Sequence, residues 1–221
     1  MIKGAIFDVD GTLLDSMSIW QDVGARYVRS RNVEPEENLA EILFPMTVEE
    51  GAIYVKQQYS LEESVEQIVQ GVLDTVRDFY YYEAPLKAGA KEFLEALAAE
   101  EIPMVVATSS ERDQIEQAFG RLNILQYFQK IFTCTEVGAG KRQPFIYQQA
   151  GEVLGAAPEE IFVFEDVLHA IKTAKAAGFR TVGLYDSSSE DHQEEIRETA
   201  DIYLGDLTDF QRFWKCAAKG K

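Results

Sequence analysis

Short apolar runs, most of them unbroken, recur along most of this chain, and stretches with helical periodicity separate them. The runs lie at residues 2–7, 103–108, 130–133, 161–164, 180–184 and 201–204. Such runs predict strands of a parallel sheet covered on both faces, because half-exposed strands alternate apolar with polar residues. Helical spacing over 87–100 and 167–178 predicts intervening helices. The alternation predicts an α/β fold with a doubly wound, Rossmann-like parallel sheet.

Residues 15–82 interrupt the alternation, since their apolar positions follow helical spacing and no strand pattern occurs among them. The insert begins directly after the first predicted strand and ends just before the next predicted helix. We therefore predict two domains. Residues 1–14 and 83–221 would form the α/β core, and residues 15–82 would form a small α-helical cap domain.

The clearest helix of the insert is predicted over 61–80, where apolar residues recur at helical spacing. Two capping boxes, in which a Ser or Thr is followed three residues later by Glu, mark possible helix starts. Ser60 with Glu63 would begin the 61–80 helix, and Thr47 with Glu50 would begin an earlier one.

Composition narrows the class of protein and of partner. The 221 residues carry a formal charge of −17, which repels nucleic acid and acidic membrane surfaces, so we expect neither as a partner. No stretch approaches the roughly 20 apolar residues that span a bilayer. Cys134 and Cys216 lack metal-site spacing, and the N-terminus lacks a signal-peptide pattern. We expect a cytoplasmic monomer.

Polar side chains follow four of the predicted strands. In chain order they are Asp8 and Asp10; Thr108 and Ser109; Lys141; and Glu165 and Asp166. The carboxyl ends of parallel strands meet at one edge of the sheet, where open α/β sheets bind their ligands. One crevice would therefore contain all of these side chains.

The chemistry of that crevice follows from its charges. Four carboxylates so close together cannot all stay ionised without cations, and Lys141 supplies one positive charge. The excess favours Mg²⁺, a hard cation that prefers oxygen ligands. Lys141, with the hydroxyl and N–H groups of Thr108 and Ser109, suits phosphate oxygens. Phosphoryl transfer to a carboxylate, with a second carboxyl as general acid and base, is the reaction these groups favour.

The chain resembles the haloacid dehalogenase-like superfamily of phosphatases in four segments. The matching segments are DVDGT at 8–12, ATSS at 107–110, Lys141 with Pro144, and FEDVLHAIKTAKAAG at 164–178. They occur in the family's order, and the helical insert resembles the cap of the β-phosphoglucomutase-like and phosphoglycolate-phosphatase-like branch. The resemblance implies a hydrolase of phosphomonoesters whose substrate is a small phosphorylated metabolite, such as a sugar phosphate.

The resemblance also implies catalytic roles. Asp8 would be the nucleophile that forms an aspartyl phosphate, and Asp10 would be the general acid and base. Thr108 and Lys141 would hold the transferring phosphoryl oxygens, with Ser109 as a further substrate contact. True dehalogenases of the superfamily lack the second acid, so Asp10 argues against cleavage of a carbon–halogen bond.

The same resemblance assigns the metal ligands. Asp8 and Asp166 would bind Mg²⁺ through their carboxylates, and Asp10 would bind it through its backbone carbonyl. Glu165 would assist directly or through a water molecule.

Departures from the family pattern keep alternatives open. The third motif usually reads Lys-Pro-x-Pro-Asp, whereas Phe145 takes the place of the final Asp here. Mutases of the branch carry a cap histidine where this chain has Trp20, so we favour a hydrolase over a phosphosugar mutase. A non-catalytic protein that binds phosphate or Mg²⁺ is a further alternative. Two roles are open for Trp20, Tyr27 and Met46: lining the substrate pocket from the cap, or forming the core of the cap. For Trp20 we predict the first.

Overall fold

The protein is described here by a computed structural model that covers residues 2–218. It divides into two compact units. The α/β unit comprises the residues up to Asp15 together with those from Pro85 onward, and the helical unit comprises Ser16–Ala84. The predicted insert, 15–82, therefore starts one residue earlier and ends two residues earlier than the helical unit.

The α/β unit is built on one six-stranded sheet in which every pair of neighbouring strands is parallel. Its strands are β1 (Gly4–Phe7), β2 (Met104–Thr108), β3 (Phe128–Thr133), β4 (Ile161–Glu165), β5 (Arg180–Leu184) and β6 (Ile202–Leu204). Their order across the sheet is β3-β2-β1-β4-β5-β6. All six predicted strands are present, and the doubly wound α/β fold is confirmed.

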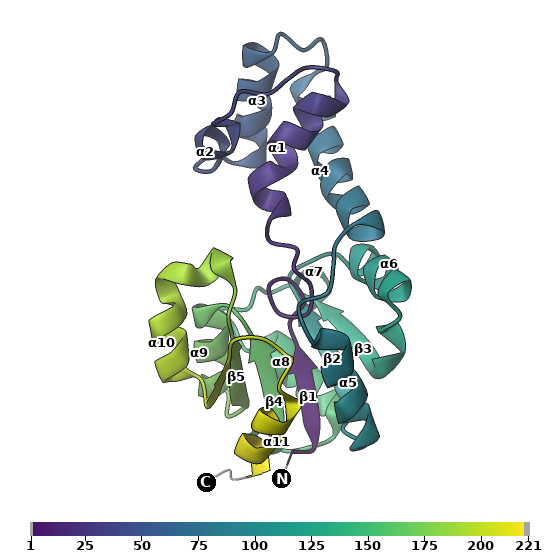
Figure 1. The fold of residues 1–221 in the computed structure, drawn as a ribbon, viewed down its shortest axis with the longest axis vertical. Coiled ribbons are helices and arrows are strands. Elements are labelled where there is room, and N and C mark those ends of the chain that lie inside the picture. Colours follow the sequence, from purple (N-terminus) through teal and green to yellow (C-terminus); the bar gives the residue numbers. More distant parts are fainter. Residues whose placement is uncertain (1, 219–221) are drawn as a thin grey trace. The chain divides into compact units, whose positions relative to one another are not determined.

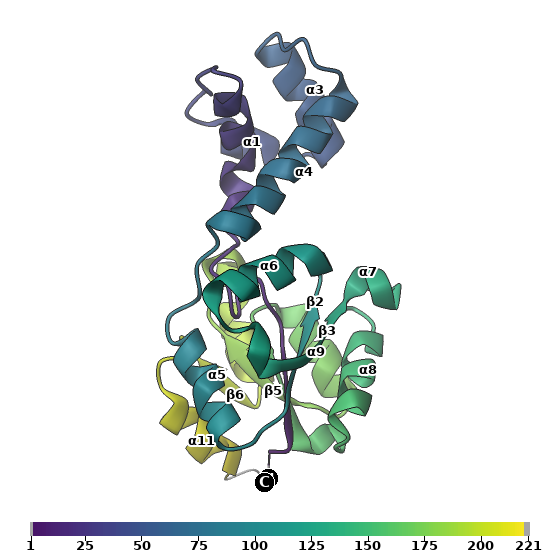
Figure 2. The ribbon, with the colours of Figure 1, turned by 90° about the vertical axis from the view of Figure 1, so that its right-hand side faces the viewer.

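Helices cover both faces of this sheet (Figure 1). They are α5 (Ala90–Ala99), α6 (Arg112–Leu122), α7 (Cys134–Val137), α8 (Phe145–Leu154), α9 (Leu168–Ala176), α10 (Gln193–Thr199) and α11 (Phe210–Ala218). Short 3₁₀ turns lie at η1 (Leu125–Tyr127), η2 (Pro158–Glu160) and η3 (Ser187–His192). Figure 2 shows α5 and α11 on one side of the sheet and α8 on the other.

Alternate residues of β4 supply the two cores on either side of the sheet. The Phe164 ring stacks on Phe7 of β1, with centroids 4.3 Å apart, and meets Phe93 of α5 edge-on. Val163 points to the opposite face and packs in the cluster that contains Tyr147 of α8. Because both faces are buried, both sets of positions must be apolar, which is why the strands read as unbroken apolar runs.

The helical unit contains four helices and a core of its own. They are α1 (Ile19–Ser30), α2 (Leu39–Leu43), α3 (Val48–Gln58) and α4 (Val65–Tyr82). Helices α1, α3 and α4 pack on one another around Tyr27, Val55 and Ile68, all of them buried. None of the helices within residues 2–218 combines the length and the apolar character needed to cross a bilayer.

One of the two predicted capping boxes is present and the other is wrong. Thr47 and Glu50 exchange the two expected hydrogen bonds at the start of α3. The box predicted at Ser60 and Glu63 lies four residues too early, because Ser64 caps α4. Ser60 has φ +52°, in the left-handed region just past the end of α3, whereas a capping residue needs extended backbone.

Candidate active site

The sheet order places the candidate site at the point where the chain reverses its direction of winding. Strand β1 lies between β2 and β4. The sheet continues from β2 to β3 on one side of β1, and from β4 to β5 and β6 on the other. Asp8 directly follows β1, and its backbone N–H donates to the carbonyl of Phe164 at 3.0 Å. Glu165 is the last residue of β4. The backbone pairing therefore brings these two carboxylates to the crevice where open α/β sheets bind ligands.

Four of the predicted site residues form one buried cluster. The ammonium of Lys141 donates to Asp8 Oδ1 and, at 2.8 Å, to Glu165 Oε1. Carboxylate oxygens of Asp8, Glu165 and Asp166 all lie within 4.8 Å of one another. Each of the four side chains is less than a tenth exposed. The acids that are far apart in the sequence thus meet around a single lysine.

The first motif also contacts Asp166. The hydroxyl of Thr12 donates to Asp166 Oδ1 at 3.3 Å. Gly11 has φ +80°, and a Cβ atom there would lie 2.4 Å from Asp166 Oδ2. Only glycine accommodates both the left-handed backbone and this close approach. Thr12 and Gly11 were not singled out from the sequence, although both stand inside the DVDGT segment.

Hydroxyl groups after β2 hold the second acid. The Ser110 hydroxyl donates to Asp10 Oδ2, and the Ser110 N–H donates to the hydroxyl of Thr108 at 3.0 Å. Thr108 is fully buried at the end of β2. Ser109 is exposed, and its hydroxyl lies 3.5 Å from the sulfur of Cys134. The β1 and β2 loops are thus joined through Asp10 and Ser110.

Tyr147 is a polar member of the site that sequence reasoning missed. Its hydroxyl donates to Glu165 Oε1 at 2.7 Å, the same oxygen that accepts from Lys141. Tyr147 lies on α8, and its ring packs in the core. In the sequence it is one more apolar position of a helix, so only its spacing of six residues after Lys141 could have drawn attention to it.

Trp20 belongs to the helical unit, where it lines a cavity formed by residues of that unit. Its predicted contact with substrate therefore stays a prediction. Tyr27, the second of the residues left open, is buried in the core of this unit.

Burial and mutual repulsion dominate the electrostatics of the cluster. Burial raises the pKa of Asp8 to about 7; Lys141 opposes this rise, and Glu165 and Asp10 add to it. Burial, with Asp8, Glu165 and Asp186 nearby, holds the pKa of Asp166 well above its usual value. Burial alone would lower the pKa of Lys141, but its two carboxylate partners raise it instead. The lysine is therefore charged throughout the physiological range.

The residues present fit a divalent cation. When ionised, the three carboxylates and the lysine carry a formal charge of −2, which one dication would neutralise. Glu165 Oε2 and Asp166 Oδ2 are buried and have no hydrogen-bond partner within the described residues. Buried carboxylate oxygens are costly without a partner, and an all-oxygen donor set suits Mg²⁺.

Comparison with known proteins agrees with this geometry. A family model for haloacid dehalogenase-like hydrolases matches residues 5–184. The chain belongs to this family. It is 31% identical over 209 residues to the validoxylamine A 7'-phosphate phosphatase of Streptomyces hygroscopicus subsp. limoneus, covering 95% of this chain and 96% of the relative.

Further relatives of this haloacid dehalogenase-like hydrolase agree with the family assignment. A phosphorylated carbohydrates phosphatase of Thermotoga maritima is 25% identical over 181 residues, covering 82% of this chain and 84% of the relative. A Thermotoga maritima crystal structure assigned as a beta-phosphoglucomutase superposes with a TM-score of 0.84 at 24% identity, covering 97% and 99% of the two chains, which supports the fold. The protein is a hydrolase acting on phosphomonoesters, and the non-catalytic alternative is set aside.

Proposed function

We propose that this hydrolase is a Mg²⁺-dependent phosphatase that cleaves a small phosphorylated metabolite through an aspartyl phosphate on Asp8. The observation that carries the proposal is the buried cluster of Asp8, Glu165 and Asp166 around Lys141. A cation and three acids at the end of β1 and β4 suit the binding and transfer of a phosphoryl group.

In the first half of the reaction, a carboxylate oxygen of Asp8 attacks phosphorus and the bond to the leaving oxygen breaks. Asp10 gives its proton to that oxygen, so the organic product leaves as an alcohol. Lys141, Thr108 and Ser109 bind the phosphoryl oxygens. The hydrogen bond from Ser110 orients the Asp10 carboxyl group for this transfer.

In the second half, Asp10 takes a proton from a water molecule as that water attacks phosphorus. The bond between phosphorus and Asp8 breaks, inorganic phosphate leaves, and the Asp8 carboxylate is restored. The two acids thus have different tasks, although only one residue separates them.

Asp8, Asp166, the backbone carbonyl of Asp10 and, directly or through water, Glu165 would hold Mg²⁺. When bound, the cation shields the negative charges of Asp8 and the phosphoryl oxygens from each other. Tyr147 and Lys141 both donate to Glu165 Oε1, so the other oxygen of this carboxylate, Oε2, would be available to the metal.

The names of two relatives support a proposal for the substrate class. By their names, two of them act on validoxylamine A 7'-phosphate and on phosphorylated carbohydrates. We infer a sugar phosphate or a similar phosphomonoester for this chain, and we propose that the helical unit acts as a cap that sets substrate choice. The monomeric state and the cytoplasmic location stay predictions.

The test is phosphate release from 4-nitrophenyl phosphate with and without Mg²⁺. Asp8→Asn should lower kcat by at least about 10³-fold, because it removes the nucleophile. Asp191→Asn is the matched control, since it makes the same change at an exposed position of η3 and should retain activity. Equal activity of Asp8→Asn and the unchanged protein would overturn the assignment.

A second assay separates hydrolysis from the mutase alternative. The protein is incubated with β-glucose 1-phosphate and a trace of the corresponding bisphosphate. We expect free phosphate to be released; glucose 6-phosphate formed without free phosphate would favour a mutase. A panel of phosphorylated sugars, phosphoglycolate and nucleotides would then identify the substrate.

A further inference from the structure

Tyr147 takes no part in the bond-making and bond-breaking steps proposed above, yet it contacts the buried cluster. Its hydroxyl lies 2.7 Å from Glu165 Oε1, the oxygen that also accepts from Lys141 at 2.8 Å. An ionised carboxylate only accepts hydrogen bonds, so the tyrosine is the donor. Tyr147 and Glu165 are each at most 1% exposed, and their hydrogen bond is therefore shielded from bulk water.

The Tyr147 hydroxyl reaches Glu165 from a rigid part of the fold. Tyr147 is the third residue of α8, and its ring is buried in the core, with the centroid of the Phe179 ring 6.4 Å away. Helix α8 packs against β1 and β2, the strands that lead to Asp8 and Thr108. Because a ring packed in the core has little freedom, its hydroxyl occupies a fixed position beside the carboxylate.

Lys141, the other donor to this oxygen, comes from a less constrained segment. It lies in the connection between α7 and α8, where a Cβ atom on Gly138 or Gly140 would meet nothing within 4 Å. Its ammonium group also donates to Asp8, and in the proposed reaction it binds phosphoryl oxygens as well. Since its hydrogen bonds are divided in this way, Lys141 alone does not define the orientation of the Glu165 carboxylate.

The second oxygen of Glu165 is the one that remains for a cation. Oε2 is buried and has no hydrogen-bond partner within residues 2–218, and the same is true of Asp166 Oδ2. The terminal torsion of a glutamate is broad, so the two carboxylate oxygens can exchange places unless one of them is held. The two donors on Oε1 hold it, and Oε2 is thereby kept free of the lysine.

We propose that Tyr147 is a positioning residue that fixes the Glu165 carboxylate so that Oε2 is presented to Mg²⁺. This role rests on the proposed function, since it concerns the same cation. Tyr147 acts only through Glu165 and does not itself reach the phosphoryl group. Residues that hydrogen-bond to metal ligands typically contribute about 10- to 100-fold to metal affinity, because they hold the ligand in the geometry of the complex.

The experiment is a calorimetric titration of the substrate-free full chain with MgCl₂ at pH 8. Tyr147→Phe keeps the ring and removes only the hydroxyl, so the packing of α8 should be retained. Its Mg²⁺ affinity should be about tenfold weaker than that of the unchanged protein. Glu165→Ala, which removes the carboxylate itself, should lose at least as much affinity.

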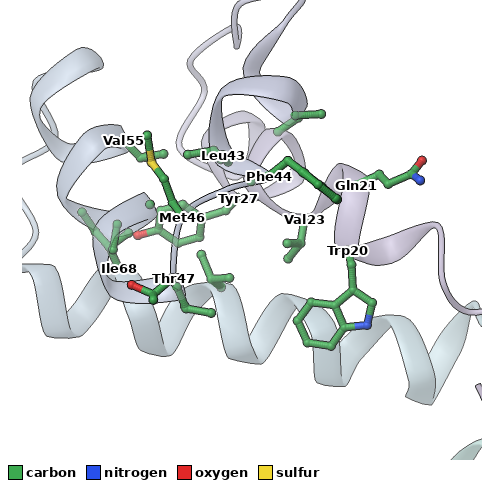
Figure 3. Close-up of a pocket in the computed structure, with 17 residues that line it drawn as sticks. Trp20, Gln21, Val23, Tyr27, Leu43, Phe44, Met46, Thr47, Val55 and Ile68 are labelled. Atoms are coloured by element: carbon green, nitrogen blue, oxygen red, sulfur yellow. The ribbon is translucent and has the colours of Figure 1, made fainter. Parts of the chain in front are cut away.

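Two other tyrosines provide matched controls. Tyr203→Phe removes a hydroxyl that donates to Gln193 Oε1 at 2.9 Å, on the edge strand β6. Tyr27→Phe removes a buried hydroxyl without a hydrogen-bond partner in the described part of the chain; Figure 3 shows this side chain beside Met46 and Ile68 in the helical unit. Both controls should bind Mg²⁺ within about twofold of the unchanged protein, because distant sites act independently.

Activity provides a second readout. With 4-nitrophenyl phosphate as substrate, Tyr147→Phe should need about ten times more Mg²⁺ for half-maximal rate, while kcat at saturating Mg²⁺ stays within about threefold. A hydroxyl that only stabilised the fold would lower the unfolding free energy and leave the Mg²⁺ requirement unchanged. Urea unfolding of metal-free Tyr147→Phe and Tyr203→Phe measures that loss separately.

Three results would overturn the role of Tyr147 and leave the proposed function intact. Tyr147→Phe could bind Mg²⁺ as tightly as the unchanged protein, it could lose more affinity than Glu165→Ala, or its kcat could stay low at saturating Mg²⁺. Failure of Tyr147→Phe to fold would assign the hydroxyl a structural role and overturn the positioning role as well. An unchanged protein that neither binds Mg²⁺ nor releases phosphate would instead refute the proposed function, and the role of Tyr147 with it.

Discussion

Gly11→Ala tests the geometry of the candidate site most directly, because two separate costs meet at this residue. The backbone has φ +80°, where an L side chain costs about 1–2 kcal/mol. The added Cβ would also lie 2.4 Å from Asp166 Oδ2 and 2.7 Å from its Cγ, while ordinary contact begins at 3.4 Å. The Asp166 carboxylate must therefore move by about 1 Å, whereas metal–ligand distances tolerate about 0.2 Å.

Gly155→Ala is the matched control for the backbone cost. Gly155 has φ +66° at the end of α8, and nothing lies within 4 Å of a Cβ built there. Both variants should lose about 1–2 kcal/mol of unfolding free energy in urea, with any further loss confined to Gly11→Ala. Gly155→Ala should keep kcat/KM within about twofold. Gly11→Ala should lose at least about tenfold and need more Mg²⁺ for half-maximal activity.

The outcome that would refute this reasoning is equally clear. If Gly11→Ala and Gly155→Ala show the same kcat/KM and the same Mg²⁺ requirement, Asp166 either has room to move or does not hold the metal. A loss of activity in Gly11→Ala at every Mg²⁺ concentration, with no change in the Mg²⁺ requirement, would instead place the damage at proton transfer by the Asp10 carboxyl group.

Three further predictions concern protons and helix capping. Because the pKa of Asp8 is raised to about 7, the metal-free protein should lose stability as pH rises from about 4 towards 7. Below pH 7 a proton on Asp8 should compete with Mg²⁺. Titrations that follow the unfolding temperature should therefore give about tenfold weaker Mg²⁺ affinity at pH 6 than at pH 8, and equal affinities would contradict the assignment. Burial would raise the pKa of Asp201, but hydrogen bonds from Thr181 and Lys175 lower it. Because Asp201 is exposed, solvent weakens these interactions, and Asp201→Asn should cost only about 0.5–1.5 kcal/mol at pH 7 and progressively less as pH falls through 3.8 and below. Urea unfolding at both ends of this pH range would show the difference. Ser64→Ala should destabilise the protein by about 1 kcal/mol and Ser60→Ala by less, and the reverse order in thermal unfolding would restore the capping box predicted at Ser60.

The sheet and most of the candidate site could be predicted because both follow from short-range patterns. An apolar run that ends in a polar residue identifies the end of a strand, and parallel strands bring their carboxyl ends together. Asp8, Glu165 and Lys141 are found in contact for this reason, although 133 positions separate the lysine from Asp8. The wrong capping box shows the limit of such patterns: Ser60 and Ser64 both stand three residues before a Glu or Gln, and only the backbone angle at Ser60 decides between them.

The residues that could not be predicted are those whose meaning depends on a partner far away in the sequence. Tyr147 and Tyr27 look alike in the sequence, since each is a tyrosine at an apolar position of an amphipathic helix. In the structure the Tyr147 hydroxyl donates to Glu165, whereas the Tyr27 hydroxyl is buried and has no hydrogen-bond partner among residues 2–218. Hydrophobic periodicity registers only the ring, which is buried in both cases. Accounting for the partner of each buried hydroxyl separates the two residues, because of the two only the Tyr147 hydroxyl is tied to the candidate site.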